Sequence, residues 1–545
     1  MYIIQKGGAF VLREVRASRS LLGGVLILTA GNLIVKLIGL LFKVPLSRLL
    51  GDEGMGYFNT GYAVYSWLYL IGCTGFPIAV SMLVSEATER EGDDRAAKRV
   101  LSVSLFLLFL IGAVGFFLLR FFSRPIAVRI GNPGSASAVS AIAPAVLFCS
   151  LSGGVRGYFQ GKKRMGPTAV SQLTEALLKL ILGMVFAHRA IDAGRDLSSV
   201  AAAAIRGVTV GTVASTVFLL VVLFFEREKS VNLNNGRERG EKRAVTRRLI
   251  SIALPITFSA TVMSVTGLID LILVMRRLVS AGYTLSEATA QFGNYTTLAV
   301  PFFNLPGILI SPIATGIVPF ISSDLARLDD GSANRRGATA IRASLFLSLP
   351  SALAIGLFGK RILSLFFLPS SAAVAAPSLS VLSPGIVFLA LTTVSGAILQ
   401  ARGRAGVTVV SMLTGATVKM IAGYFLIGLP SVGVYGAAIG TVLCYGVAAV
   451  INLFALSYSR DRSISVSAFL RPIPPALLSF AFAYSIGFLL PDKEGVFATV
   501  LILSVACALY LPLAFLFGAV TGEDVEFFPF LQKIVPRSFA PRRTK

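Results

Sequence analysis

Residues 101–119 read LSVSLFLLFLIGAVGFFLL, a stretch without a single charged side chain. At about 1.5 Å per helical residue, roughly 20 residues cross the roughly 30 Å of hydrocarbon in a bilayer. A strand of a membrane β-barrel needs only about 10 residues of alternating polarity, whereas this stretch is apolar on every face. Because only helices and closed barrels satisfy their backbone groups in lipid, the stretch predicts a membrane-spanning helix.

Similar stretches recur along the 545 residues, of which 55% are hydrophobic and only 14% charged. A soluble domain carries about 25% charged residues, so this composition excludes an ordinary water-exposed surface. We therefore predict an all-α membrane protein with about 14 transmembrane helices. The approximate spans are 22–42, 58–84, 100–119, 137–160, 167–188, 200–225, 249–276, 289–322, 338–358, 375–400, 407–428, 433–458, 472–490 and 496–518.

The positions of the cations explain the formal net charge of +24. With the N-terminus in the cytoplasm, roughly 33 of the 50 Lys and Arg residues fall on the cytoplasmic side, as the positive-inside rule expects. We predict that both termini and the 226–248 loop are cytoplasmic. The basic loops are expected to contact membrane lipids rather than nucleic acid.

The sequence offers little for enzymatic chemistry. It contains one histidine, His188, and no phosphate-binding loop, dinucleotide fingerprint or nucleophile elbow in a usable context. We expect no enzyme activity, no metal site and no cofactor, and transport driven by an ion gradient, the membrane potential or the substrate's own gradient. The coupling ion, Na⁺ or H⁺, stays open.

An internal repeat organises the chain. Residues 160–183 read QGKKRMGPTAVSQLTEALLKLILG, and residues 400–423 read QARGRAGVTVVSMLTGATVKMIAG, with about half of the positions identical. The repeat predicts two six-helix lobes related by roughly a half-turn about the membrane normal, with the substrate pathway between them. The predicted divisions are an N-terminal lobe (1–225), a cytoplasmic linker (226–248), a C-terminal lobe (249–458), and two added helices with a cytoplasmic tail (459–545).

Ionisable residues inside the predicted helices are the functional candidates, because charge in hydrocarbon usually faces a cavity or a partner. By distance along their helices, Lys36, Lys179 and Lys419 lie near the membrane midplane. Glu175 precedes Lys179 by one turn and is able to pair with it. Structural roles stay open, either a Glu175–Lys179 pair or side chains that reach the interface. The candidate substrate-binding residues are Lys36, Lys43, Arg156, Gln160, Gln172, Glu175, Lys179, Asp270 and Lys419.

A cavity lined by lysine and arginine favours an anionic substrate, which in a membrane means a phosphate or pyrophosphate head group. We predict that Lys36 and Lys419, one from each lobe, face a central aqueous cavity and hold a pyrophosphate. A cation-coupled drug or small-molecule exporter of the same fold is the alternative. That alternative predicts dependence on Glu175 or Asp270 instead of the lysines.

Several stretches resemble the family of stage V sporulation protein B and the polysaccharide-biosynthesis transporters, which belong to the multidrug and oligosaccharidyl-lipid exporter superfamily. They are RGYFQGKKRMGPTAVSQLTEALLK (156–179), KLIGLLFKVPLSRLLGDEGMGYF (36–58), GFPIAVSMLVSEA (75–87) and GLIDLILVMRRLVSAG (267–282). The resemblance implies 14 helices in two lobes and alternating access. It also implies that the protein flips a lipid-linked anionic oligosaccharide, an undecaprenyl-pyrophosphate-linked cell-wall precursor, across a bacterial cell membrane. We expect the protein to be a monomer.

The sequence departs from the family at two points. Family members often carry arginine where this chain has Lys36 and Lys43, and lysine lacks the bidentate fork that arginine offers a phosphate. More distant peptidoglycan-lipid flippases use an arginine in helix 8, whereas residues 292–322 here contain no cation.

Overall fold

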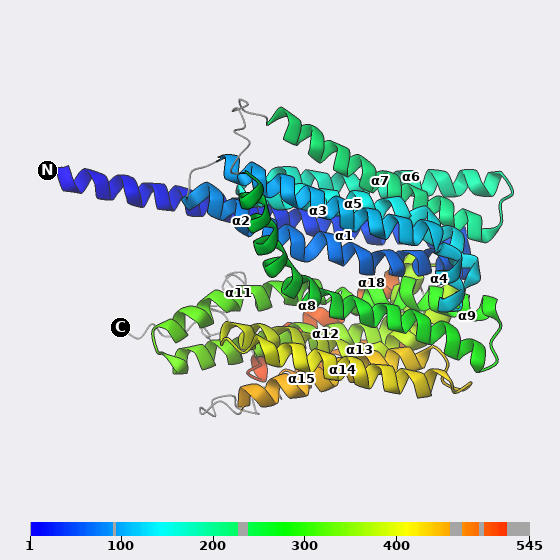
Figure 1. The fold of residues 1–545 in the computed structure, drawn as a ribbon. Coiled ribbons are helices and arrows are strands. Elements are labelled where there is room, and N and C mark those ends of the chain that lie inside the picture. The colour runs from blue at the N-terminus through cyan, green and yellow to red at the C-terminus, as the bar shows by residue number, and fades with distance from the viewer. Residues whose placement is uncertain (1, 91–93, 227–237, 458–470, 490–494, 520–545) are drawn as a thin grey trace. The chain divides into compact units, whose positions relative to one another are not determined.

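The computed structural model describes residues 2–90, 94–226, 238–457, 471–489 and 495–519, and within these ranges the chain is helical without a strand (Figure 1). Ten of the described helices are long and apolar enough to cross a membrane, and two shorter apolar helices accompany them. Over the described residues all fourteen predicted spans fall mainly on helical segments, so the predicted all-α membrane fold is confirmed. Residues 227–237 of the predicted linker 226–248 and the tail beyond residue 519 lie outside the described residues.

The first half of the chain contributes seven long helices, two short ones and two irregular turns. They are α1 (Tyr2–Leu70), η1 (Ile71–Gly75), α2 (Phe76–Arg90), α3 (Asp94–Phe121), α4 (Ser123–Ile130), η2 (Pro133–Ser135), α5 (Ala136–Gly161), α6 (Met165–Asp192), α7 (Leu197–Phe225), α8 (Glu238–Ser280) and α9 (Leu285–Asn294).

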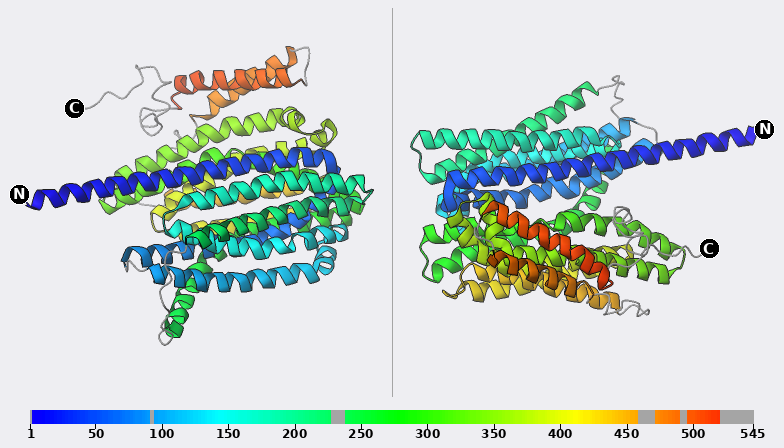
Figure 2. Two further views of the ribbon diagram at one scale, coloured as in Figure 1. Left: turned by 90° about the horizontal axis from the view of Figure 1, so that it is seen from above. Right: turned by 180° about the vertical axis from the view of Figure 1, so that it is seen from behind.

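The rest of the described chain is built in the same way. Its elements are η3 (Tyr295–Ala299), α10 (Val300–Asn304), α11 (Gly307–Ala326), α12 (Asp330–Phe366), α13 (Pro369–Ala401), α14 (Ala405–Ile427), α15 (Tyr435–Ser457), α17 (Ile473–Leu489) and α18 (Val496–Leu516). The helices α17 and α18 lie side by side as a hairpin (Figure 2).

The helix α1 folds back on itself at Gly51, whose φ of 63° and ψ of −174° are not helical. The rings of Phe42 and Phe58 lie 5.9 Å apart, although 16 residues of straight helix would separate them by about 24 Å. The two halves therefore run alongside each other and account for the predicted spans 22–42 and the start of 58–84. A backbone of this kind is essentially restricted to glycine.

Two of the predicted spans are interrupted by π-helical turns, η1 within 58–84 and η3 within 289–322. Gly75, the last residue of η1, approaches α8 so closely that a Cβ there would collide with Thr257 and the carbonyl oxygen of Ala253. The span 289–322 holds Pro301, Pro306, Pro312 and Pro319, and it is divided into four successive elements, α9, η3, α10 and α11.

Internal packing divides the chain into two compact units. Unit 1 comprises residues 1–276 and 285–293, and unit 2 comprises residues 277–284 and 294–545. Most of α8 therefore packs with unit 1, whereas the sequence places it at the start of the second lobe. The lobe boundaries and the half-turn relation between the lobes stay predictions.

Inside each unit the helices pair in the same order. In unit 1, α5 packs against α3 and α7, and α6 packs against α7; in unit 2, α13 packs against α12 and α15, and α14 packs against α15. Glycines allow the α6–α7 and α14–α15 backbones to meet, because a Cβ at Gly207 would collide with Gly183 and one at Gly436 with Ile427. Small residues at such interfaces are typical of membrane helices.

The turn inside the sequence repeat has the same hydrogen bonds in both copies. In unit 1 the amides of residues 162, 163 and 164 donate to the carbonyls of 158, 160 and 159. In unit 2 the amides of 402, 403 and 404 donate to the carbonyls of 398, 400 and 399, at an offset of 240 throughout. The middle residue of the turn has a positive φ in both, 59° at Lys163 and 72° at Gly403. The repeat is therefore structural as well as sequential.

Candidate functional site

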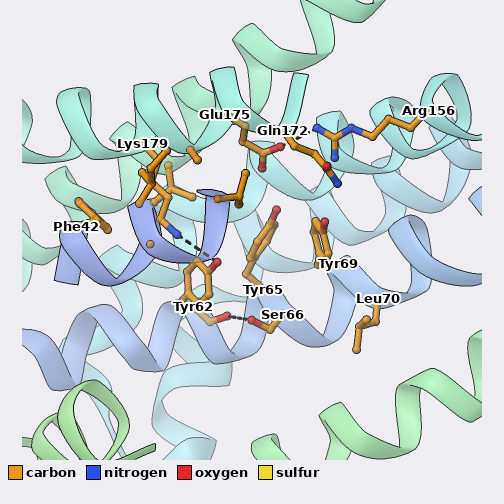
Figure 3. A pocket seen from close by; sticks show the side chains of 15 residues that line it. Phe42, Tyr62, Tyr65, Ser66, Tyr69, Leu70, Arg156, Gln172, Glu175 and Lys179 are labelled. Carbon is orange, nitrogen blue, oxygen red and sulfur yellow. Dashed lines mark hydrogen bonds and ion pairs between the residues drawn. The ribbon is translucent and has the colours of Figure 1, made fainter. Parts of the chain in front are cut away.

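A cavity of about 390 Å³ lies within unit 1, between the two halves of α1 and the helices α5, α6 and α7 (Figure 3). Its volume is at the lower end of the roughly 300–1,000 Å³ that ligand pockets occupy. Its lining residues are Val35, Ile38, Gly39, Phe42, Tyr62, Tyr65, Ser66, Tyr69, Leu70, Arg156, Gln172, Glu175, Ala176, Lys179 and Val208.

Arg156 and Glu175 form a buried ion pair at one wall of the cavity. Arg156 is only 6% exposed, and its Nη2 donates to Glu175 Oε2 at 2.9 Å. The same guanidinium donates to Ser171 Oγ at 3.0 Å and to Ser215 Oγ at 3.2 Å. Arg156 therefore does not reach out to the membrane interface, a possibility that the sequence left open.

Glu175 is held by helix α7 as well as by Arg156. Thr212 donates to its Oε1 at 3.2 Å, and Ser215 donates to its Oε2 at 3.4 Å. The sequence suggested that Glu175 pairs with Lys179, and the structure gives the carboxylate a different partner. The reason is that α5 places the guanidinium of Arg156, with its planar fork of donors, against the same face of α6.

Lys179 lies in the middle of α6, 14 residues after Met165 and 13 before Asp192. Its Nζ donates to the Tyr62 hydroxyl at 3.3 Å and lies 4.5 Å from the centre of the Tyr62 ring and 5.5 Å from that of Phe42. Within the described part of the chain, no carboxylate forms an ion pair with this ammonium. Its positive charge is met by hydroxyl and aromatic groups alone.

The second half of α1 presents a row of tyrosines to the cavity. Tyr62, Tyr65 and Tyr69, with Ser66, are spaced three or four residues apart, which places them on one helix face. Neighbouring tyrosine ring centroids lie 5.7 and 5.5 Å apart, and Phe58 stacks on Tyr62 at 6.0 Å. The row gives the cavity an aromatic wall edged by hydroxyl groups (Figure 3).

The charges of the lining favour an anion. Arg156 and Lys179 each contribute one positive charge and Glu175 one negative charge, so the ionised lining carries 2 − 1 = +1. The single carboxylate of the lining is already neutralised by Arg156. The positive charge that is left belongs to Lys179.

Four of the nine predicted site residues line this cavity, namely Arg156, Gln172, Glu175 and Lys179. The other five lie elsewhere. Lys36 is exposed on α1, Lys43 is half-buried within electrostatic range of Lys179, Gln160 is half-buried at the end of α5, Asp270 is half-buried in α8, and Lys419 is half-buried in α14. The tyrosine row was missed, although its spacing on a helix face is visible in the sequence.

The second copy of the repeat forms the same helices without the Arg156–Glu175 ion pair. At the offset of 240, Arg156 corresponds to Gly396 and Glu175 to Gly415, while Lys179 corresponds to Lys419. In unit 2 the α15 backbone lies directly against Gly415, because a Cβ at Gly415 would collide with the carbonyl of Cys444. The same helix hairpin thus forms with and without the ion pair.

Comparison with known proteins identifies the family. The family model described as polysaccharide biosynthesis protein matches residues 21–324, and a second one, MatE, matches residues 295–425. The first covers more than half of the chain, which therefore belongs to the polysaccharide biosynthesis protein family of membrane flippases and is not an enzyme.

Individual relatives extend the likeness over nearly the whole chain. It is 26% identical to stage V sporulation protein B of Bacillus subtilis over 530 residues, covering 96% of this chain and 100% of that protein. It is 24% identical to the lipid II flippase MurJ of the same organism, covering 95% and 97%. A solved structure of the lipid II flippase MurJ in an inward closed conformation is similar in fold, with a TM-score of 0.70 at 14% identity, covering 90% of this chain and 98% of that one.

Proposed function

We propose that this protein flips a pyrophosphate-linked oligosaccharide on a polyprenyl lipid across the bacterial cell membrane by alternating access. The observation that carries the proposal is the ammonium of Lys179, which lies in the cavity of unit 1 without a carboxylate partner among the described residues. The name of one relative, lipid II flippase, supports a lipid-linked sugar as the cargo. Both termini are proposed to be cytoplasmic.

A positive charge held by aromatic rings inside a membrane protein is costly unless an anion or water meets it. A pyrophosphate would supply that anion and would also satisfy the two ammonium protons that Tyr62 does not accept. The charge would then be fully compensated only when substrate is bound. This arrangement favours an anionic head group over a cationic drug.

The alternative function, a cation-coupled exporter, needs a carboxylate that is available to a cation. Glu175 is the single carboxylate of the cavity lining. Hydrogen bonds from Arg156, Thr212 and Ser215 already engage both of its oxygens. The position of Glu175 therefore supports a counter-ion role toward Arg156.

The test replaces Lys179 by Met in the full-length protein reconstituted into nanodiscs. We expect the affinity for a polyprenyl pyrophosphate to fall roughly 10- to 100-fold, because a charge-assisted hydrogen bond contributes about 1.5–3 kcal/mol. Lys179→Arg should retain most of the affinity, and an uncharged polyprenol should bind both variants equally weakly. Unchanged pyrophosphate affinity in Lys179→Met would refute the proposal.

A second variant separates the two functions. Glu175→Gln removes the only negative charge of the lining, so an anion should bind more tightly, by severalfold, because the positive charge of Arg156 is then no longer neutralised by Glu175. A cation exporter predicts the reverse, which is loss of cation binding and no gain for pyrophosphate. Equilibrium binding of both ligand classes to the same protein preparation decides between them.

A further inference from the structure

One polar atom of the cavity lining has no partner among the residues that the structure describes. The Oε1 atom of Gln172 is buried and accepts no hydrogen bond from them. Gln172 lies on α6, one turn before Glu175, and its side chain points into the cavity (Figure 3). A buried amide oxygen that accepts nothing is costly, so this position is suited to a donor brought by a ligand or by water.

Opposite this acceptor lies the row of Tyr62, Tyr65 and Tyr69. Tyrosine faces are apolar while their hydroxyl groups and Ser66 Oγ are hydrogen-bonding groups, so this wall is amphipathic. A pyranose ring has matching surfaces, an apolar face of C–H groups and a polar edge of hydroxyl groups. A polyprenyl chain, in contrast, would leave the Oε1 atom of Gln172 without a donor.

The cavity thus combines two kinds of recognition. At one end Lys179 offers a positive charge, and along the wall Gln172 and the tyrosines offer an acceptor and stacking surfaces. These are the groups that a sugar attached to a phosphate would need, in adjacent places. A volume of about 390 Å³ suits one glycosyl phosphate unit rather than an extended oligosaccharide.

The repeat indicates that the amide of Gln172 is not needed for folding. Gln172 corresponds to Met412 in unit 2, and Met412 occupies the same turn of the equivalent helix α14. An apolar side chain is therefore compatible with this backbone. The amide of Gln172 then needs an explanation other than packing.

We propose that the cavity of unit 1 is a glycosyl phosphate subsite, in which Gln172 and the tyrosine row bind the first sugar of the head group and Lys179 binds the adjoining phosphate. This inference rests on the proposed function, because it assigns parts of the same substrate to separate groups of residues. It adds that the protein distinguishes a sugar-bearing lipid from the bare polyprenyl pyrophosphate.

The experiment measures the affinity of the nanodisc-embedded full-length protein for two ligands, a polyprenyl pyrophosphate carrying one N-acetylhexosamine and the same lipid without sugar. The wild type should prefer the sugar-bearing lipid by roughly tenfold, as one hydrogen bond plus one stacking contact would give. Gln172→Met and Tyr69→Leu should each reduce the preference severalfold while leaving affinity for the sugar-free lipid unchanged. Lys179→Met should weaken both ligands alike.

Matched variants control for folding. Gln172→Met installs the residue that the repeat already carries, and Tyr69→Phe keeps the ring, so it should keep most of the preference. Tyr484→Leu removes an exposed tyrosine of α17 outside the cavity and should leave both affinities unchanged. Equal wild-type affinity for both lipids overturns the subsite but leaves the proposed function standing, whereas binding of neither lipid overturns both. Retained preference in both Gln172→Met and Tyr69→Leu also overturns the subsite.

Discussion

Arg156 illustrates how this protein keeps a charge inside a helix bundle. Its guanidinium donates to one carboxylate and two hydroxyl groups, so its burial is compensated on several sides. A buried pair often contributes little net stability compared with apolar side chains, yet removing one partner leaves an uncompensated charge. The pair is therefore expected to be strongly coupled.

A double-mutant cycle tests this coupling. Arg156→Met and Glu175→Met should each destabilise the protein, by about 3 kcal/mol, because each leaves the other charge buried without its counter-ion. The double variant should be markedly more stable than the sum of the two losses predicts. Thermal unfolding in detergent measures all three, and additive losses would show that the two side chains act independently.

How far the sequence predicts this site differs from residue to residue. Lys179 and Glu175 stand out because charge within an apolar helix is rare, and spacing along α6 already puts them on one face. The partner of Glu175 was not predictable, since it depends on how α5 packs against α6. The tyrosine row was overlooked because aromatic residues at helical spacing are ordinary in a membrane segment, and only the fold-back of α1 turns that face toward a cavity.

At the scale of single elements, the spans were predictable because hydrophobicity alone sets them. The interruptions of these spans were not predictable. The π-helical turns η1 and η3 depend on tertiary contacts, such as the close approach of Gly75 to α8, and composition carries no signal for them. The reversal of α1 had a sequence cue in the polar residues between two apolar spans, while the single residue that makes it possible emerges only from the backbone angles.

Gly51 offers a direct test of that reversal. Gly51→Ala should destabilise the protein by about 1–3 kcal/mol, since a side chain in this backbone conformation is strained although the space around it is open. Gly166→Ala is the matched control, because Gly166 lies in the first turn of α6, also has open space around it, and is helical. Equal thermal midpoints for the two variants would contradict the proposed strain.

At the scale of the whole molecule, duplication has given two units with the same helix pairing and different chemistry. Unit 1 carries the ion pair and the polar cavity, and unit 2 carries glycines at the positions that correspond to Arg156 and Glu175. A retained lysine, Lys419, is the common element. Its aliphatic stem packs beside Gly440, where a Cβ would lie 3.3 Å from Lys419 Cγ.

We predict that Lys36 and Lys419, one in each unit, both support transport. Replacing either by Met removes the charge and keeps the bulk, so transport should fall strongly while protein level and membrane insertion are retained. Replacement by Arg should be tolerated better. The measurement is complementation of a null strain together with quantified membrane protein, and full complementation by both Met variants would remove these lysines from the transport pathway.

The tyrosine row has a spectroscopic consequence. Trp67 is the single tryptophan of the chain, and in the sequence it stands between Ser66 and Tyr69 on the second half of α1. Excitation energy absorbed by Tyr62, Tyr65 or Tyr69 is therefore transferred in part to one nearby indole, and the emission of that indole comes from this segment of the chain. The native protein thus carries its own label-free optical probe on the helix that lines the cavity, and we expect ligand entry to change its emission without a single substitution.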